Sequence, residues 1–265
     1  MTDIRKGTAL VTGASSGIGA VYAERLAQRG YDLVLVARNQ ERLDTLASRI
    51  SLDTQRNVEV LAADLANAAQ LAQVERKLRE DASITLLVNN AGIGTHTGVL
   101  ESDVERMAEM IALNITALTR LTYAAVPGFV ARQQGALINV SSVVSLAPEL
   151  LNGVYGGSKA YVTAFTHSLH KELAGQGIQV QAVLPGATAT EFWQIGGLPL
   201  ENLDASTVMT ASDLVEGALQ DFDAGVLVSI PAMHDLQHYQ RYESSRQALL
   251  GNLSSNQLAP RYSTK

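Results

Sequence analysis

Short apolar runs alternate with amphipathic stretches along most of the chain. Seven runs have the length of strands and are rich in aliphatic residues. They occupy residues 8–12, 31–37, 57–63, 85–90, 135–141, 177–185 and 225–230. Most of these runs are apolar nearly throughout, which is typical of parallel strands covered on both faces. Helical spacing of apolar residues marks the stretches between them, at 19–30, 41–50, 69–80 and 103–133.

This alternation predicts one fold class. Parallel strands joined by right-handed helical crossovers form a doubly wound sheet with helices on both faces. We therefore predict an α/β fold, with one Rossmann-type sheet of seven parallel strands in a single domain over residues 1–265. Two segments break the pattern. Residues 187–212 are long for a connection, and 234–265 are polar and predict a C-terminal helix and tail.

Composition narrows the range of partners. The formal net charge is -6, so a general nucleic-acid or anionic-membrane binder is not expected. The absence of cysteine excludes disulfides and thiolate metal sites, and without a paired-histidine motif we expect no metal. No apolar run reaches the roughly 18 residues of a membrane span. The N-terminus has no signal-peptide core, so we expect a cytoplasmic protein.

A glycine-rich turn follows the first predicted strand. The stretch TGASSGIG places Gly13, Gly17 and Gly19 at the start of a predicted helix. Glycine permits a tight turn and a close backbone approach to a diphosphate, which then meets the positive end of the helix. An ordinary glycine-rich turn remains the alternative interpretation at this point.

A second motif lies in a later predicted helix. Tyr155 and Lys159 are four residues apart, which places both side chains on one helix face. A tyrosine with its ordinary pKa of about 10 is a poor base at neutral pH. A neighbouring ammonium group favours the phenolate, so we expect Lys159 to lower the pKa of Tyr155.

Seven motifs in order resemble the short-chain dehydrogenase/reductase family. They are TGASSGIG at 12–19, DL at 64–65, NNAG at 89–92, Asn114, NVSS ending at Ser142, YGGSK at 155–159 and PGATAT at 185–190. The resemblance covers about residues 8–230 and implies hydride transfer between a nicotinamide and a carbonyl or alcohol. One departure is Gly157, where an alanine often stands in the family.

The resemblance implies a catalytic set of Asn114, Ser142, Tyr155 and Lys159. Tyr155 would be the general acid/base, and Lys159 would also bind the nicotinamide ribose. Ser142 would hydrogen-bond the substrate oxygen, with Ser141 as the competing candidate. Asn114 would hold a water through its backbone carbonyl and extend the proton relay.

The resemblance also implies the cofactor site. Its expected residues are Gly13, Ser15, Ser16, Gly17, Ile18, Gly19, Arg38, Asp64, Leu65, Asn90, Ala91, Gly92, Tyr155, Lys159, Pro185, Gly186, Thr188 and Thr190. An acidic residue at the end of the second strand binds the ribose of NAD, whereas arginine attracts a 2'-phosphate. Ala37 and Arg38 stand there. We therefore expect NADP(H) to be preferred, with NAD(H) as the alternative.

Apolar residues near these motifs predict the substrate. We expect Val143, Val144, Leu150, Leu151, Phe192 and Trp193 to line its site, which favours an apolar or aromatic ketone or aldehyde over a sugar. Residues 187–212 combine Gly196, Gly197 and Pro199 with large apolar side chains, and we predict a mobile substrate lid. A permanently packed loop is the alternative.

The interpretation is thus an NADP(H)-dependent carbonyl reductase or alcohol dehydrogenase. The alternatives are a cofactor-sensing NADP-binding protein with little turnover and an epimerase or dehydratase on a related scaffold. The complete catalytic set disfavours a sensor, and the short region after the last strand disfavours the epimerase branch. The resemblance further suggests a homodimer or homotetramer packed through helices at about 103–133 and 153–175.

Overall fold

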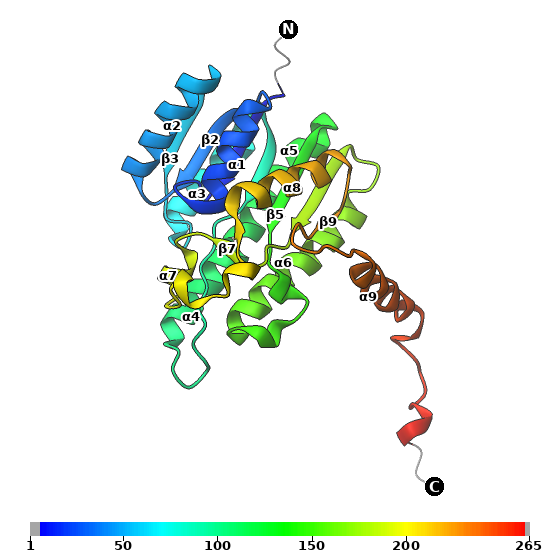
Figure 1. The fold of residues 1–265 in the computed structure, drawn as a ribbon. Coiled ribbons are helices and arrows are strands. Elements are labelled where there is room, and N and C mark those ends of the chain that lie inside the picture. Colours follow the sequence, from blue (N-terminus) through cyan, green and yellow to red (C-terminus); the bar gives the residue numbers. More distant parts are fainter. Residues whose placement is uncertain (1–5, 263–265) are drawn as a thin grey trace. The chain divides into compact units, whose positions relative to one another are not determined.

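The computed structural model describes residues 6–262, and its main element is one seven-stranded parallel sheet (Figure 1). The strands, in chain order, are β1 (Thr8–Thr12), β2 (Asp32–Ala37), β3 (Val58–Ala62), β4 (Ile84–Asn89), β5 (Gly135–Val140), β6 (Ile178–Val183) and β9 (Val228–Ser229). Every neighbouring pair is parallel. The seven predicted runs all form strands of this sheet, so the predicted fold class is confirmed.

The strand order predicts a ligand-binding crevice at the carboxyl ends of the central strands. Across the sheet the order is β3-β2-β1-β4-β5-β6-β9, so the chain moves outward from β1 to β3 and then crosses to the other side of β1. At such a switch point the loops that follow the two central strands diverge and leave a crevice. The loops after β1 and β4 therefore flank the expected ligand position.

Long helices connect the strands. They are α1 (Gly17–Gln28), α2 (Gln40–Thr54), α3 (Ala68–Glu80), α4 (Val104–Ile111), α5 (Leu118–Arg132), α6 (Gly153–Glu172) and α8 (Ala211–Asp223). Side-chain oxygens cap several of them: Asn39 accepts from the Arg42 amide of α2, and Asn152 accepts from two amides in the first turn of α6. Each cap satisfies helix-terminal donors that have no partner within the helix.

The helices cover both faces of the sheet because consecutive strand side chains point in opposite directions. Ala9 and Val11 of β1 pack in a buried cluster with residues of α1, α2 and α8. Leu10, between them in sequence, packs in a second cluster with residues of α3, α5 and α6. Strands covered on both faces have no solvent-exposed face that would carry polar side chains, which explains the continuous apolar runs in the sequence.

The stretch predicted as one helix over 103–133 is interrupted. Between α4 and α5 lies a π-helical segment, η1 (Ala112–Ala117), in which each turn holds an additional residue. A hydrophobic pattern of period 3.6 does not reveal this change, since the apolar residues continue through it.

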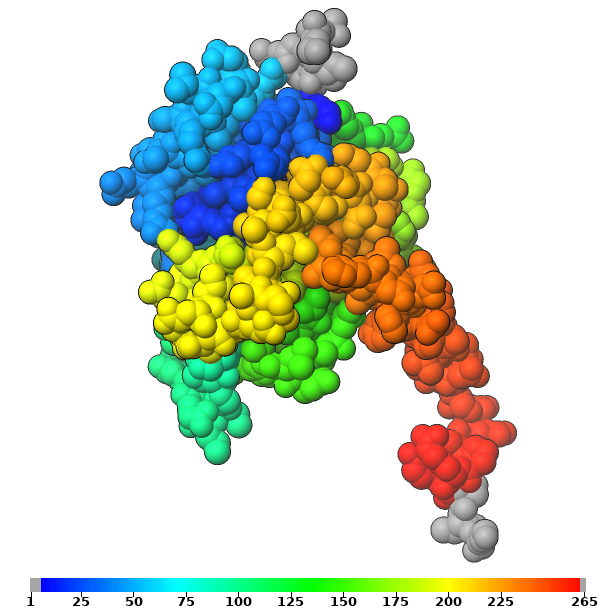
Figure 2. Space-filling model, viewed as in Figure 1, coloured from blue at the N-terminus to red at the C-terminus, as the bar shows by residue number. Residues whose placement is uncertain are grey.

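Residues 187–212 contain only short elements. They are β7 (Thr188–Ala189), α7 (Phe192–Ile195), η4 (Leu200–Asn202), η5 (Ala205–Thr207) and β8 (Met209–Thr210), and β7 pairs with β8 in a separate two-stranded sheet. None of α7, η4 and η5 contains a buried residue. In the space-filling view this segment, coloured yellow, forms part of the surface (Figure 2).

The chain divides into two compact units, Met1–Ala232 and Met233–Lys265. The sheet and all helices described above belong to the first. The second contains α9 (Gln237–Ala248) and two single turns, η6 (Leu250–Asn252) and η7 (Pro260–Tyr262), with no buried residue in any of them. Over residues 6–262, no helix is both long and apolar enough to cross a bilayer.

Candidate active site

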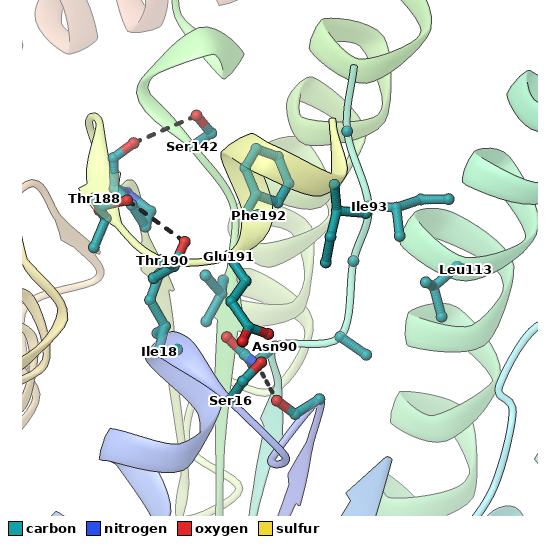
Figure 3. A pocket seen from close by; sticks show the side chains of 18 of the residues that line it. Ser16, Ile18, Asn90, Ile93, Leu113, Ser142, Thr188, Thr190, Glu191 and Phe192 are labelled. Carbon is teal, nitrogen blue, oxygen red and sulfur yellow. Dashed lines mark hydrogen bonds between the residues drawn. The ribbon is translucent and has the colours of Figure 1, made fainter. Parts of the chain in front are cut away.

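A cavity of about 440 Å³ opens at the carboxyl ends of the central strands. Its walls come from the turn after β1, the ends of β2, β4 and β5, the start of α6, and the segment after β6. Figure 3 labels residues around this space, among them Ser16, Ile18, Ile93, Thr188, Thr190, Glu191 and Phe192. The cavity thus lies where the strand order reverses.

The glycine-rich turn forms one wall. Ser15, Ser16, Gly17 and Ile18 line the cavity together with Gly13. Gly13 and Gly17 have positive φ angles of 66° and 54°, which side chains disfavour. A Cβ on Gly17 would lie 3.0 Å from the Thr190 methyl group. Backbone N–H groups at this helix start are therefore open to an anion.

Gly19 has a different role from its neighbours. It does not line the cavity, and a Cβ there would overlap the carbonyl oxygen of Gly13 and the side chain of Asn90. The Asn90 amide donates to the carbonyl oxygen of Thr12, at 2.9 Å, and to that of Gly13. Gly19 therefore permits the close packing that holds the turn against the end of β4.

The ends of β3 and β4 form the adjacent wall. Asp64, Leu65, Asn90, Ala91 and Gly92, which are expected to bind the cofactor, all line the cavity. The backbone amide of Asp64 donates to Gln70, and its carboxylate accepts from the amide of Ala66 at 3.0 Å. These bonds fix the loop after β3 in position.

Tyr155 and Ser142 meet at the cavity although they come from different elements. Tyr155 lies in the first turn of α6, and Ser142 caps the short helix η2 (Val143–Ser145) after β5. Both side chains line the cavity, and their hydroxyl groups are hydrogen-bonded to each other. Ser141 also lines the cavity, but its hydroxyl is engaged: it donates to the Lys159 carbonyl oxygen at 2.8 Å and bonds to Thr163.

Lys159 lies beneath Tyr155 on the same helix face. Its ammonium group donates to the Val140 carbonyl oxygen at 2.9 Å and lies 5.9 Å from the centre of the Tyr155 ring. A Cβ on Gly92 would be 3.5 Å from the Lys159 nitrogen, so the glycine leaves the ammonium group accessible from the cavity.

The pKa values of this pair differ from the sequence-based expectation. Burial raises the pKa of Tyr155 to about 12, and the hydrogen bond with Ser142 opposes only part of that shift. Burial also lowers the pKa of Lys159 to about 8. The expected lowering of the Tyr155 pKa by Lys159 is absent from this arrangement, because desolvation of the phenol dominates and the lysine charge is itself disfavoured.

Asn114 lies behind the cavity wall, inside the π-helical segment η1. Only 2% of the residue is exposed. Its side-chain oxygen accepts from the Ile93 amide at 3.0 Å, and its amide donates to the Ile93 carbonyl oxygen and to the Ser158 hydroxyl. Because π-helical turns are frequent at functional sites, this distortion agrees with the position predicted from the sequence.

The segment after β6 closes another side. Pro185, Gly186, Thr188 and Thr190, which are expected to bind the cofactor, line the cavity. The Ser142 hydroxyl lies 3.4 Å from the Pro185 carbonyl oxygen. The Thr188 hydroxyl donates to the Gly186 carbonyl oxygen at 3.1 Å, which stabilises the turn.

The apolar part of the cavity contains most of the residues expected at a substrate site. Val143, Val144, Leu151, Phe192 and Trp193 line it. The Phe192 ring lies 5.7 Å from the Tyr155 ring, centre to centre, and packs edge-on against Trp193. The Trp193 indole donates to the Thr188 carbonyl oxygen at 2.9 Å.

Leu150 departs from this expectation. It is the last residue of the single turn η3 (Pro148–Leu150), does not line the cavity, and is 65% exposed. The single turn rotates its side chain away while its neighbour Leu151 faces inward. Sequence adjacency alone could not distinguish the two leucines.

Several lining residues were not predicted from the sequence. They include Asn39, Arg42, Ile93, Gly94 and Glu191. Gly94 is required by packing, because a Cβ there would overlap the Phe192 ring and lie 3.1 Å from the Tyr155 ring. Arg42 lies in the first turn of α2, close in sequence to Arg38 at the end of β2.

The assembled site combines three chemical capacities. The glycine turn presents backbone donors to a phosphate, Ser142 and Tyr155 present hydroxyl groups at one point, and Lys159 supplies an ammonium group beside them. Gly13 and Gly17 line the open cavity, so a dinucleotide can approach their backbone closely. The residues present therefore fit a nicotinamide dinucleotide.

Comparison with known proteins gives concordant findings. The family model described as short chain dehydrogenase matches residues 7–195. A solved short-chain dehydrogenase from Sphingobium yanoikuyae, in complex with NADPH, is 46% identical with a TM-score of 0.93, covering 97% of this chain and 100% of that one. The bulky-bulky ketone specific alcohol dehydrogenase from Comamonas testosteroni is 42% identical with a TM-score of 0.89, covering 97% of this chain and 99% of that one.

A curated relative is more distant. Hydroxysteroid dehydrogenase-like protein 1 of Gallus gallus is 35% identical over 186 residues, covering 69% of this chain. The matched region spans only 56% of the length of that relative.

Proposed function

Because this chain belongs to the short-chain dehydrogenase family and is an oxidoreductase acting on CH-OH or C=O groups, we propose that it is an NADP(H)-dependent carbonyl reductase of apolar or aromatic ketones and aldehydes. The observation that carries the proposal is the meeting of Ser142, Tyr155 and Lys159 beside a glycine-lined cavity with an apolar end. All of these residues lie in the first compact unit.

Each polar residue has a proposed role. Tyr155 donates its hydroxyl proton to the substrate oxygen during reduction and accepts it during oxidation. Ser142 hydrogen-bonds the same oxygen and orients the carbonyl. Lys159 hydrogen-bonds the cofactor ribose through its ammonium group. The nicotinamide cofactor, when bound, supplies or accepts the hydride.

Asn114 acts through the backbone in this proposal. Its side chain is fully engaged with Ile93 and Ser158, which fixes the η1 turn. The Asn114 carbonyl oxygen would then hold the water that extends the relay from Lys159. A buried amide with three partners keeps this carbonyl in one orientation.

The preference for NADP(H) is supported by charge at the end of β2. Ala37, Arg38 and Asn39 line the cavity there, and no carboxylate occupies this strand end to bind the ribose diol of NAD. Arginine forms paired hydrogen bonds to phosphate groups. The Sphingobium relative was solved with NADPH, which agrees with this assignment.

The apolar lining supports a bulky substrate. Val144, Leu151, Phe192 and Trp193 line the cavity together with Tyr155, and none of them offers a charge to an acid or a sugar. The named substrate class of the Comamonas relative, a bulky-bulky ketone, agrees with this lining. Residues 187–212 act in this proposal as a lid that excludes water from the reaction.

We also propose a cytoplasmic homodimer or homotetramer. Tyr123 of α5 is 68% exposed and stacks on Phe165 of α6, whose ring also stacks on Tyr161. Such an exposed aromatic face on two helices suits a contact between copies. Light scattering of the purified chain tests this part, and a monomer at micromolar concentration would contradict it.

The cofactor assignment is tested by fluorescence titration with NADPH and NADH. We expect tighter binding of NADPH, and reversal of the preference in the double variant Ala37→Asp with Arg38→Ile. The new carboxylate repels a 2'-phosphate while the attractive arginine is lost. Tighter binding of NADH by the unmodified protein would contradict the proposal. A panel of bulky ketones, small ketones and sugars, assayed with NADPH, tests the substrate class.

A further inference from the structure

An ion pair joins the start of α2 to the segment that follows β7. Arg42 lies in the first turn of α2, and its Nη1 donates to Glu191 Oε2 at 2.7 Å. The two residues are 149 positions apart in the chain. Both line the cavity, together with Arg38 at the end of β2. The pair therefore bridges the cavity end expected to hold the 2'-phosphate and the segment expected to cover the substrate.

The residues on either side of Glu191 contact two other parts of the site. Thr190, before it, approaches Gly17 of the glycine-rich turn. Phe192, after it, packs against the ring of Tyr155. Glu191 thus lies between Thr190, which contacts the glycine-rich turn, and Phe192, which contacts the proposed proton donor Tyr155. Figure 3 shows Thr190, Glu191 and Phe192 following one another along the cavity wall.

The pair is weak as a purely structural contact. Both side chains are about half exposed, at 51% and 50%, and exposed ion pairs contribute little to stability. The hydrogen bond from Arg42 lowers the pKa of Glu191, so the carboxylate is charged at neutral pH. Within residues 6–262, Glu191 is the hydrogen-bond partner of this guanidinium, through Nη1 alone. Its Nε and Nη2 N–H groups are available to an anion.

We propose that Arg42 is a second ligand of the NADP 2'-phosphate and that, through Glu191, it couples phosphate binding to closure of the segment over the substrate. The inference rests on the NADP(H) preference proposed above. The anion lies beside Arg38 and Arg42, at the positive N-terminus of α2. One edge of the Arg42 guanidinium binds the phosphate. The opposite side, through Nη1, remains paired with the Glu191 carboxylate.

The coupling arises from preorganisation. A free arginine side chain loses rotational entropy when it is fixed in one ion pair. Once the phosphate holds the Arg42 guanidinium in place, Glu191 pairs with a side chain that is already ordered. NADPH therefore favours the closed segment, and by linkage the closed segment favours NADPH. NADH, which lacks the phosphate, gives no such effect.

The first experiment tests phosphate binding. In Arg42→Gln we expect the dissociation constant of NADPH to rise at least about 10-fold and that of NADH to change less than about 3-fold, since charge-assisted hydrogen bonds are worth one or two such factors. Arg49→Gln is the matched control. Arg49 lies on the same helix and pairs with Glu24, but it does not line the cavity. An equal loss for both cofactors in Arg42→Gln would overturn the inference.

The second experiment tests the coupling. In the unmodified enzyme we expect the KM of the ketone to be at least about 3-fold lower with NADPH than with NADH, a coupling within the usual range. In Glu191→Gln this ratio falls to about 1, while the preference for NADPH in binding is retained. A general structural role for Glu191 would raise both KM values together and leave their ratio unchanged. That result would overturn the coupling.

The two proposals fail in different ways. If the unmodified protein binds NADH at least as tightly as NADPH, the proposed cofactor preference fails and the inference falls with it. If the protein prefers NADPH but Arg42→Gln keeps the full preference, the cofactor proposal stands and the role of Arg42 is wrong.

Discussion

The residues proposed for proton transfer and the start of the segment 187–212 lie at the same cavity but are held in opposite ways. Asn114, Ser142, Tyr155 and Lys159 are between 2% and 8% exposed, and each has its hydrogen-bond partners within the protein. The segment 187–212 instead consists of one two-stranded pair and several single turns. Its helix α7 (Phe192–Ile195) has no buried residue.

This difference suits the two regions to different tasks, namely proton transfer for the buried residues and substrate selection for the segment 187–212. Proton transfer requires fixed geometry, which burial and complete hydrogen bonding provide. The mobile cover proposed for residues 187–212 would have to open and close, which suits a part of the structure with few buried contacts. The two regions meet at the contact between Phe192 and Tyr155.

The largest effect is expected from Tyr155→Phe. We expect turnover to fall by about 10² to 10⁴, the usual contribution of general acid/base catalysis, because the substitution removes one hydroxyl and almost no volume. Steady-state kinetics with NADPH measure the loss, and titration should show that NADPH still binds. Tyr161→Phe is the matched control, because Tyr161 lies on the same helix and bonds to Thr119 outside the cavity. Near-normal turnover in Tyr155→Phe would remove this residue from the mechanism.

The next effect concerns the buried charge of Lys159. Its pKa in the folded protein is about 8, below the ordinary 10.5. Between these values the unfolded chain binds more protons, so the free energy of unfolding rises with pH over this window. Below pH 8 the cost of burial is fully present.

Lys159→Met removes this dependence. We expect the stability of the unmodified protein, relative to Lys159→Met, to improve by on the order of 3 kcal/mol between pH 7 and pH 10.5. Urea denaturation of both proteins across this range measures the difference. A constant difference would show that the lysine keeps its ordinary pKa when folded.

A smaller effect is expected in the exposed segment. NADPH with an unreactive substrate analogue should slow hydrogen exchange of amides in 188–212 by roughly 10-fold or more if the segment closes from a mobile state. Amides of β5 provide the internal reference. Emission of Trp193, the single tryptophan, should shift in parallel. Equal protection in both states and unchanged emission would indicate a permanently packed loop.

The smallest effect is expected on stability, from alanine substitutions at the neighbouring glycines Gly156 and Gly157 of α6. A Cβ on Gly157 has no atom within 4 Å, whereas one on Gly156 would lie 2.8 Å from the Pro148 carbonyl oxygen. We expect Gly157→Ala to stabilise the protein by about 0.5 to 1 kcal/mol through helix propensity, with turnover retained. Gly156→Ala should destabilise it. Thermal unfolding of the two variants provides the comparison, and destabilisation by Gly157→Ala would contradict it.

Sequence patterns predicted the regular part of the molecule well. Buried parallel strands must be apolar on both faces, so all seven were visible as continuous runs. The site motifs follow strand ends, and parallel strands bring their carboxyl ends to one edge of the sheet. The positions of Ser142 and Tyr155 followed from this rule and from the family resemblance.

Other features depend on three-dimensional packing and were not predicted. The direction of the Tyr155 pKa shift is set by desolvation, which no sequence motif reports. The outward rotation of Leu150 depends on a single turn of η3. The pairing of Arg42 with Glu191 joins segments far apart in the chain, and neither residue belongs to a motif.

The π-helical turn at Ala112–Ala117 sets the angular phase of two helices that would otherwise be one. One residue turns an α-helix by about 100°, so the additional residue offsets the apolar stripe of α4 from that of α5 by about that angle. The same offset directs Asn114 toward Ile93 and Ser158. Deleting one residue of this turn would restore a uniform α-helix. Either the Asn114 side chain would then turn away from Ile93 and Ser158, or the apolar face of α4 or of α5 would turn away from its neighbours. Length in this short stretch is therefore constrained as strictly as residue identity.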